Sequence, residues 1–277
     1  MEIPSLRASP RLPVLFVGHG SPLNVIQPNA YRPGWEALGA EFGRRWPRPA
    51  LILCISAHWL TQGWWLTGMA QPPTIHDFGG FPQALFEQQY PAPGAPELAQ
   101  ALAAALRQPD TEQPLAVDTQ DWGLDHGCWG VLKPMFPQAD IPVIQLSIDY
   151  SQPPEAHYAL GRQLRGLRER GVLVLASGNI VHNLRTLRRE VPDNQAYDWA
   201  VDFDHWVAGL LAQGRPEALV SFLAQGELAR LAHPTYDHFL PLLYAAGAAH
   251  ADDTVEFFNA GFQGASISMR SVIWDTP

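Results

Sequence analysis

Short apolar runs alternate along the chain with longer segments in which apolar residues recur at helical spacing. The four runs cover residues 13–18, 50–56, 142–148 and 172–177, and helical spacing occurs at 35–46, 95–107 and 155–170. Short, nearly continuous apolar runs suit strands that are buried on both faces of a parallel sheet. The alternation therefore predicts an α/β fold, with a central, largely parallel or mixed sheet flanked by helices.

The last third of the chain adds further elements. We expect strands at 254–259 and 266–274, and helices at 199–211, 217–224 and 236–246. Pro and Gly gather at 71–82 and 91–96, which indicates long loops. Because no linker, repeat or change in composition divides the sequence, we predict a single domain over residues 1–277.

Composition narrows the range of functions. The chain has 27 acidic against 18 basic residues, a formal net charge of −9, and nucleic-acid binding requires clustered Lys and Arg, so we expect no nucleic-acid partner. No apolar stretch approaches the roughly 20 residues that cross a bilayer, and the amino terminus lacks a signal-peptide pattern, so we expect no membrane partner. We expect a cytoplasmic protein whose two cysteines, Cys54 and Cys128, remain thiols.

The sequence lacks the usual signatures of α/β enzymes. It contains no GxGxxG after the first strand, no GxxxxGK[ST] and no GxSxG, which removes the dinucleotide fingerprint, the phosphate loop and the nucleophile elbow. Lys133 is the single lysine and stands beside Pro134, which argues against a pyridoxal-phosphate enzyme.

Histidines follow the predicted strands instead. His19, His58 and His182 come just after three of the apolar runs, and ligands bind beyond the carboxyl ends of strands in open α/β sheets. His238, which opens a predicted apolar helix, and His126, in the polar loop DWGLDHGCWG, are further candidates. Imidazoles from separate segments that meet at such a crevice are suited to a mononuclear metal site.

Structural roles remain open for each histidine taken singly, and the joint placement of His19, His58 and His238 is what favours metal binding. On a continuous helix His233 and His238 would point about 140° apart, so they would not share a ligating face. Asp237, next to His238, competes with it as a ligand, since only one of two adjacent helical residues faces the metal. We expect three more to be structural or to lie at the surface: His157, which we place on a solvated, Arg-rich helix face, His205 and His250.

His182 suggests a second role. Asn179 is a plausible helix N-cap, which would place His182 in the first helical turn, where the helix dipole disfavours the protonated ring. A neutral imidazole in a crevice is ready to accept a proton, as a general base must. The alternative is a buried histidine that packs at a helix start.

Tryptophans accompany these histidines. Trp59 follows His58, and Trp122 and Trp129 flank His126. A flat apolar lining of this kind would accommodate an aromatic substrate, although tryptophan is also simply a large core residue.

Several motifs together resemble one known family. They are HGSPLNVI, SAHW, PPTIHDFGGFP, YPAPG, DHGCWGVL, QLSID, ASGNIVHNLR and HPTYDHFLPLLYAAG, spread from Leu12 to about Ser271. In this order they resemble the 4,5-DOPA extradiol dioxygenase-like proteins. These belong to the class III extradiol ring-cleaving dioxygenases, the superfamily of the protocatechuate 4,5-dioxygenase catalytic subunit.

The resemblance implies a site as well as a fold. His19, His58 and His238 match metal ligands, and His182 matches an acid–base histidine that is sometimes counted at the metal. His126 matches a substrate-side histidine. The loop with His76 and Asp77 is characteristic of the branch, but the resemblance gives it no role.

The implied activity is extradiol cleavage of a catechol such as DOPA with O2, at one mononuclear metal ion. The wider superfamily uses two histidines and a glutamate, the set expected for Fe(II), whereas His238 stands at the third position here. Three imidazoles also suit Zn(II). The alternatives are a zinc-dependent hydrolase and a protein that binds metal or aromatic compounds without turnover. The sequence leaves the physiological substrate and the oligomeric state open.

Overall fold

A mixed sheet runs through the centre of the protein, whose computed structural model describes residues 6–277. Its strand order is β4-β3-β5-β2-β6-β1-β10-β7. The strands are β1 (Val14–Gly18), β2 (Leu51–Thr61), β3 (Trp65–Thr67), β4 (Ala116–Asp118), β5 (Val143–Asp149), β6 (Val172–Gly178), β7 (Thr254–Phe258) and β10 (Ser271–Asp275). A separate pair is formed by β8 (Phe262–Gln263) and β9 (Ile267–Ser268).

The four predicted central runs form the parallel part of this sheet. β5, β2, β6 and β1 lie side by side and pair in parallel, while β10 and β7 extend one side in antiparallel pairing. On the other side β3 pairs antiparallel with β5 and parallel with β4. The sheet is therefore mixed, as the sequence predicts, with its parallel strands buried at the centre.

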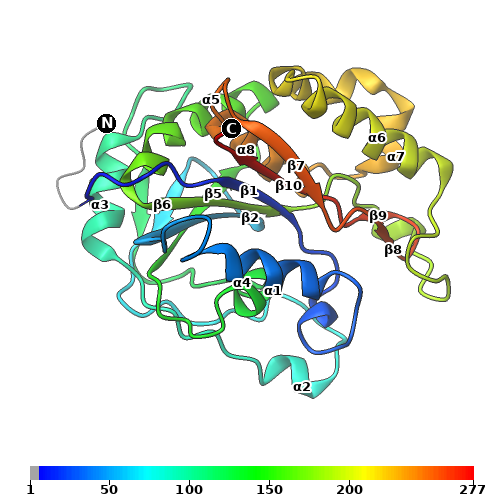
Figure 1. Ribbon diagram of the computed structural model, residues 1–277, viewed down its shortest axis with the longest axis horizontal. Helices are drawn as coiled ribbons and strands as arrows, with labels where there is room; N and C mark the ends of the chain where they lie inside the picture. Colours follow the sequence, from blue (N-terminus) through cyan, green and yellow to red (C-terminus); the bar gives the residue numbers. More distant parts are fainter. Residues whose placement is uncertain (1–5) are drawn as a thin grey trace.

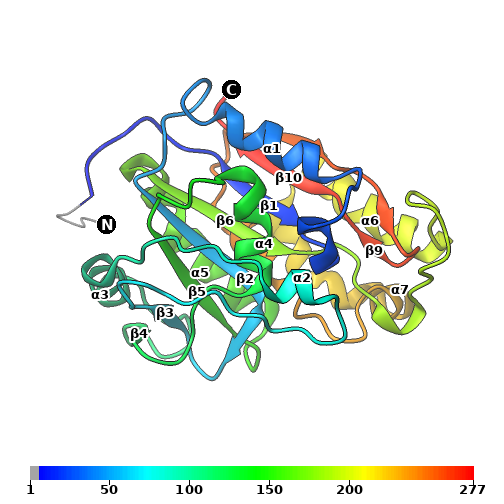
Figure 2. The same ribbon diagram turned by 90° about the horizontal axis from the view of Figure 1, so that it is seen from below.

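Helices cover both faces of the sheet, as Figures 1 and 2 show. α1 and α4 lie over one face, and α3, α5, α6, α7 and α8 lie on the other side. The helices are α1 (Arg32–Glu41), α2 (Gln83–Phe86), α3 (Pro96–Ala105), α4 (His126–Met135), α5 (Pro154–Leu164), α6 (Asp198–Ala212), α7 (Glu227–Ala232) and α8 (Leu240–Ala248). Short 3-10 helices are η1 (Pro22–Val25), η2 (Arg165–Arg170), η3 (Leu184–Thr186) and η4 (Pro216–Gln225).

The alternation of side chains along each central strand creates two separate cores. In β1, Val14 and Phe16 join the core beneath α5 and α8, whereas Leu15 and Val17 join the core beneath α1 and α4. All four are fully buried. Because successive side chains of a strand point to opposite faces, a strand covered on both faces must be apolar throughout.

Three predicted elements have other boundaries in the structure. β2 does not end at Ser56 but continues to Thr61, with a register irregularity between Ile55 and Leu60 after which pairing with β5 resumes. The strand predicted at 266–274 is two strands, β9 and β10. The helix predicted at 155–170 ends as α5 and continues as the 3-10 helix η2, which Gly171 terminates at φ 74°.

Two helices in the last third also differ from prediction. The segment 217–224 forms the 3-10 helix η4, in which Ser221 leaves helical geometry. α8 begins at Leu240 rather than Tyr236, with a proline in its first turn, where proline is favoured. His238 therefore lies in the turn before the helix.

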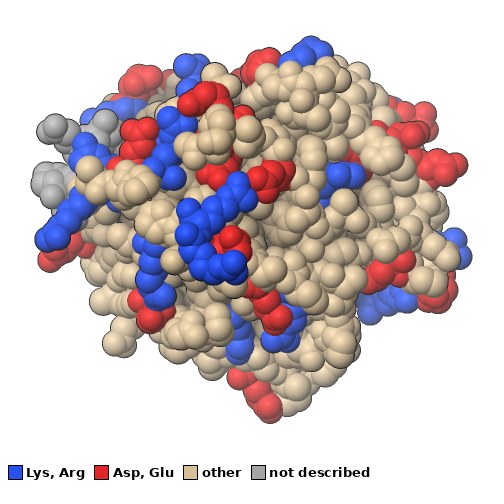
Figure 3. All heavy atoms as spheres, viewed as in Figure 1, with Lys and Arg blue, Asp and Glu red and all other residues tan. Residues whose placement is uncertain are grey.

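Charges are interspersed on the surface. On the face drawn in Figure 3, acidic and basic side chains lie close to one another. Surface ion pairs include Arg45 with Glu256 at 2.7 Å.

Within residues 6–277, no helix has the length and apolar character that crossing a membrane requires.

Candidate metal centre

His19 lies immediately after β1, at the carboxyl end of the parallel strands. Its backbone N–H donates to the Gly178 carbonyl at 3.1 Å, which ties the residue to the end of neighbouring β6. Its Nδ1 lies 3.0 Å from Ser177 Oγ, and the side chain is buried. The Ser177 contact leaves Nε2 free to point into the site.

His58 lies inside β2, at the irregularity, and not beyond the strand end as expected. Its Nδ1 lies 3.1 Å from Asp77 Oδ2, and its Nε2 lies 3.2 Å from His19 Nε2. Helix α4 approaches this ring closely at Gly127. A Cβ built on Gly127 would lie 2.4 Å from Ser56 Oγ and 2.9 Å from His58 Cδ2, so only glycine fits there.

His238 reaches the same place from the turn before α8. Its Nδ1 lies 2.6 Å from Asp237 Oδ2, and its backbone carbonyl accepts a hydrogen bond from the Asn179 N–H at 2.9 Å. Asp237 therefore contacts the ring of its neighbour through Nδ1, on the side away from the free nitrogen. The two side chains are hydrogen-bonded to each other, whereas the sequence suggested that they compete as metal ligands.

Three imidazoles thus converge. His19, His58 and His238 each offer one ring nitrogen, and these nitrogens all lie within 4.8 Å of one another. Each ring is held at its other nitrogen by Ser177, Asp77 or Asp237. Three imidazole donors with partners that fix ring orientation match the three-histidine set of mononuclear Zn(II) sites, and imidazole is also a ligand for Fe(II). The donor set fits such an ion.

His126 lies next to this cluster, and the loop in which we placed it proves to be the start of α4. Asp125 caps the helix by accepting from the Cys128 N–H at 3.1 Å. The His126 ring is buried, with its centroid 3.9 Å from that of His58. Its Nδ1 lies 3.0 Å from Asp77 Oδ2, the oxygen that also meets His58.

His182 packs against the cluster, but not at a helix start. Residues 179–182 are not helical, and the His182 N–H donates to the Ala232 carbonyl at 3.0 Å. The predicted helix dipole is therefore absent, because β9 and the end of α7 hold this segment instead. The ring stacks on His238 with centroids 3.5 Å apart and planes 5° apart. It is not among the three converging nitrogen donors.

Burial decides the charge of most of these rings. Burial, followed by the charge of neighbouring histidines, holds the pKa of His19 and that of His238 well below the usual value. Burial also lowers the pKa of His182 to about 4, so its neutral form at pH 7 has a cause other than the one expected. The pKa of His126 is lowered by burial and by His58.

Asp77 opposes the effect of burial on the pKa of His58. Burial would lower the pKa of His58, but the hydrogen bond to Asp77 and the charges of Asp125 and Asp77 outweigh it and raise that pKa. Burial would raise the pKa of Asp77, but hydrogen bonds from His126 and His58 lower it. Asp77 is therefore an ionised carboxylate between two imidazoles.

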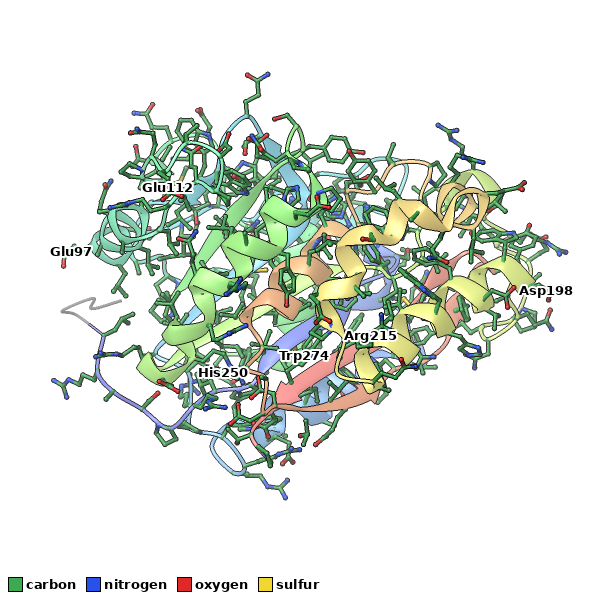
Figure 4. The ribbon with its side chains drawn as sticks, turned by 90° about the horizontal axis from the view of Figure 1, so that it is seen from above. Glu97, Glu112, Asp198, Arg215, His250 and Trp274 are labelled. Atoms are coloured by element: carbon green, nitrogen blue, oxygen red, sulfur yellow. The ribbon has the colours of Figure 1, made fainter. Side chains whose placement is uncertain are left out.

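The remaining histidines lie apart from the cluster. His157 does not face solvent as expected. It is fully buried, because its side of α5 packs on α8, and its Nδ1 lies 2.8 Å from the Tyr244 hydroxyl. His233 is buried against the Ile180 carbonyl, and His205 is exposed. His250 and Trp274 line a cavity of about 180 Å³ (Figure 4). Trp274 pairs with Val14, the first residue of β1, whereas His19 follows the last residue of that strand, so this cavity is remote from the cluster.

The tryptophans contribute less than expected. Trp129 is fully buried and donates to the Ile75 carbonyl, so it is a core residue. Trp59 and Trp122 stack 5.8 Å apart and line, with Trp65, an open hollow of about 700 Å³ that does not include the converging histidines.

Sequence reasoning missed the residues that orient the three converging rings. Ser177 appeared only as a strand end, and Asp237 only as a competitor. Asp77 had no assigned role. Its signal was the motif PPTIHDFGGFP, in which an acidic residue follows a histidine within a loop rich in Pro and Gly.

Comparison with known proteins gives a consistent result. The family model described as the catalytic LigB subunit of aromatic ring-opening dioxygenase matches residues 15–272. The chain is 47% identical over 270 residues to the 4,5-DOPA dioxygenase extradiol of Escherichia coli K12, covering 96% of each chain. It is 35% identical to the protein of the same name from Beta vulgaris, covering 92% of this chain and 94% of the relative.

Among solved structures, the chain is similar to the crystal structure of an uncharacterized Escherichia coli K12 protein. The TM-score is 0.79 at 40% identity, covering 95% of this chain and 99% of the other.

Proposed function

Because the chain belongs to the family of the catalytic LigB subunit of aromatic ring-opening dioxygenases, we propose that it cleaves a catechol such as DOPA beside its two hydroxyls with O2. The class III extradiol dioxygenases of this family are oxidoreductases that act on small aromatic compounds. DOPA itself is proposed from the names of the relatives. The observation that carries the proposal is the convergence of His19, His58 and His238.

These three residues would hold the ion through one ring nitrogen each. The family uses a mononuclear metal, and the three donors leave the remaining coordination positions of one ion to ligands from solution. Bound Fe(II) would supply a path for electrons from the catechol to O2. Ser177, Asp77 and Asp237 keep the three rings turned toward the ion, which limits reorganisation when it binds.

His182 would act as the proton carrier. Its ring is neutral at pH 7 and stacks on His238, so an unprotonated ring nitrogen is available beside the ion to accept a catechol hydroxyl proton. The same nitrogen would return that proton as the aromatic ring of the catechol opens. His126, whose ring lies next to that of His58, would hydrogen-bond the substrate with the ring nitrogen not used by Asp77.

The substrate would enter along the exposed edge of the cluster. The cavity between His19, His126 and Gly130 measures about 10 Å³, room for a single water. The side chains of His58 and Asp77 are 18% and 14% exposed, so solvent reaches the cluster from their side. A planar catechol would approach there.

The test is oxygen uptake. Metal-free protein is loaded under anaerobic conditions with Fe(II) or with Zn(II), mixed with DOPA and other catechols, and then exposed to O2. We expect uptake and a ring-opened semialdehyde with Fe(II), and neither with Zn(II), which has no accessible redox change at this site.

Other outcomes would assign a different function. Catechol binding with Fe(II) but no oxygen consumption would indicate a binding protein. Hydrolytic activity restricted to the zinc form would indicate the zinc-dependent hydrolase that the all-imidazole ligand set also permits.

A further inference from the structure

One carboxylate meets two histidines of the site. Asp77 Oδ2 lies 3.1 Å from His58 Nδ1 and 3.0 Å from His126 Nδ1. The other oxygen, Oδ1, accepts the His126 backbone N–H at 2.8 Å. Both oxygens are therefore engaged, and a single side chain connects a proposed metal ligand with a proposed substrate-side residue.

This arrangement determines where the ring protons lie. An ionised carboxylate oxygen only accepts hydrogen bonds, so each Nδ1 that faces it must carry the hydrogen. In a neutral imidazole the other nitrogen, Nε2, then holds a lone pair. For His58 that lone pair points toward His19 Nε2, 3.2 Å away, where an ion would bind. For His126 it remains available as an acceptor.

We propose that Asp77 is a positioning residue that fixes the Nδ1–H tautomer of both His58 and His126. One Nε2 is thereby directed to the metal and the other to a substrate hydroxyl. The substrate part of this inference rests on the proposed function, whereas the tautomer part requires only the geometry. Asp77 thus couples ligand orientation to substrate orientation through one oxygen.

The loop that carries Asp77 is built to hold it still. The Ile75 N–H donates to the Leu124 carbonyl at 2.7 Å, and the Leu124 N–H donates to the Pro73 carbonyl at 2.8 Å. Trp129 Nε1–H, from α4, donates to the Ile75 carbonyl at 2.8 Å. The loop is therefore fastened to the segment that begins α4, the helix on which His126 lies.

Direct metal binding by Asp77 is the competing arrangement. His58, Asp77 and His126 form a second group whose possible ligand atoms lie within 4.8 Å of one another. However, the 3.0 and 3.1 Å separations from Oδ2 have the length of N–H···O hydrogen bonds. The free Nε2 of His58 already points into the other group.

The first experiment observes the tautomers. Zinc-loaded protein labelled with ¹⁵N-histidine is studied by NMR, with signals assigned through His126→Gln. We expect protonated Nδ1 on both rings in the unaltered protein. In Asp77→Ala the His126 signals should shift toward the Nε2–H form. A His126 tautomer that stays Nδ1–H in Asp77→Ala would overturn the proposal; His58 is not diagnostic here, because zinc on its Nε2 keeps the hydrogen on Nδ1 by itself.

The second experiment measures zinc affinity. Asp77→Ala should bind Zn²⁺ tenfold to a hundredfold more weakly, as happens when an outer partner of a ligating histidine is lost. Asp77→Asn, which has the same shape, should lie between, since its amide oxygen can still accept one ring N–H. Asp121→Asn is the matched control. Asp121 is exposed, and its side chain forms no hydrogen bond or ion pair within residues 6–277.

X-ray absorption of the zinc forms separates positioning from ligation. Three imidazole ligands in both the unaltered protein and Asp77→Ala agree with a positioning role. Loss of an oxygen ligand in Asp77→Ala, or unchanged zinc affinity, overturns it. None of these measurements depends on oxygen uptake, so failure of the proposed function and failure of this inference are distinguishable.

Discussion

The buried imidazole between α5 and α8 and those of the histidine cluster differ in how their nitrogens are used. In the packing between α5 and α8, His157 commits both ring nitrogens, to the Tyr244 hydroxyl at 2.8 Å and the Gln152 carbonyl at 3.3 Å. In the cluster, His19, His58 and His238 each commit Nδ1 and aim the other nitrogen at a common point. Burial alone therefore does not mark a candidate metal ligand, whereas an uncommitted nitrogen that converges with others does.

The largest effect should come from exchanging one histidine in each setting. His238→Gln removes one of the three proposed metal donors, so we expect zinc affinity and oxygen uptake to fall more than a thousandfold, because the proposed site has three protein ligands. His157→Gln should leave both unchanged and lower thermal stability instead. Metal titration, oxygen electrode and thermal melts on both variants check this. Similar loss of metal binding in His238→Gln and His157→Gln would contradict the assignment of His157 to a purely structural role.

A second experiment tests whether proximity to the cluster implies ligation. His182→Ala should lower kcat by roughly a hundredfold to ten thousandfold, the usual contribution of a general acid–base group, while the metal stays bound. Metal content and oxygen uptake are measured on the same sample. Uptake indifferent to the substitution removes the proton-carrying role. Lost metal would make His182 a ligand.

Low pH should destabilise the protein through the buried ring of His157. Burial lowers the pKa of His157 to about 4, against about 6.5 in an unfolded chain. The unfolded state therefore takes up this proton first as the pH falls. The free energy of unfolding is therefore unaffected by His157 above pH 6.5 and falls by about 3 kcal/mol between pH 6.5 and 4. Denaturant unfolding at several pH values measures it, and His157→Gln should have the shallower pH dependence.

The smallest effect should come from Ser177→Ala. It removes the partner of His19 Nδ1 without touching the free nitrogen. We expect about tenfold weaker zinc binding, at the low end for an outer partner, and an unchanged number of ligands. Isothermal titration checks it. An affinity equal to that of the unaltered protein would mean that packing alone orients His19.

Much of the fold could be predicted from the local sequence pattern, because the central strands are continuous apolar runs. Strands covered on both faces must be apolar throughout, so β1, β5 and β6 could be placed to within a residue or two. The irregularity in β2 could not be predicted. It depends on pairing with β5, which is distant in sequence. The burial of His157 likewise depends on α8, which the arginines around it gave no reason to expect.

The same limit applies to the site. His19 could be placed because it follows a strand at the edge where parallel strands end. Asp77 lies in a loop without periodicity, and only contacts with His58 and His126 reveal what it does. For His182 the expected neutral ring was correct and the expected cause was wrong, since desolvation takes the place of a helix dipole.

Gly127 shows what the cluster demands of its scaffold. In a helix, alanine normally stabilises relative to glycine by about 1 kcal/mol, so α4 forgoes helical propensity in its first turn. Because Gly127 has no side chain, the backbone of α4 can approach the His58 ring so closely that a Cβ at this position would lie 2.9 Å from His58 Cδ2. Replacing this glycine with alanine, an exchange that normally stabilises a helix, would here push the new methyl group against Ser56 and His58, so it would disturb the proposed metal site without the usual gain in heat resistance.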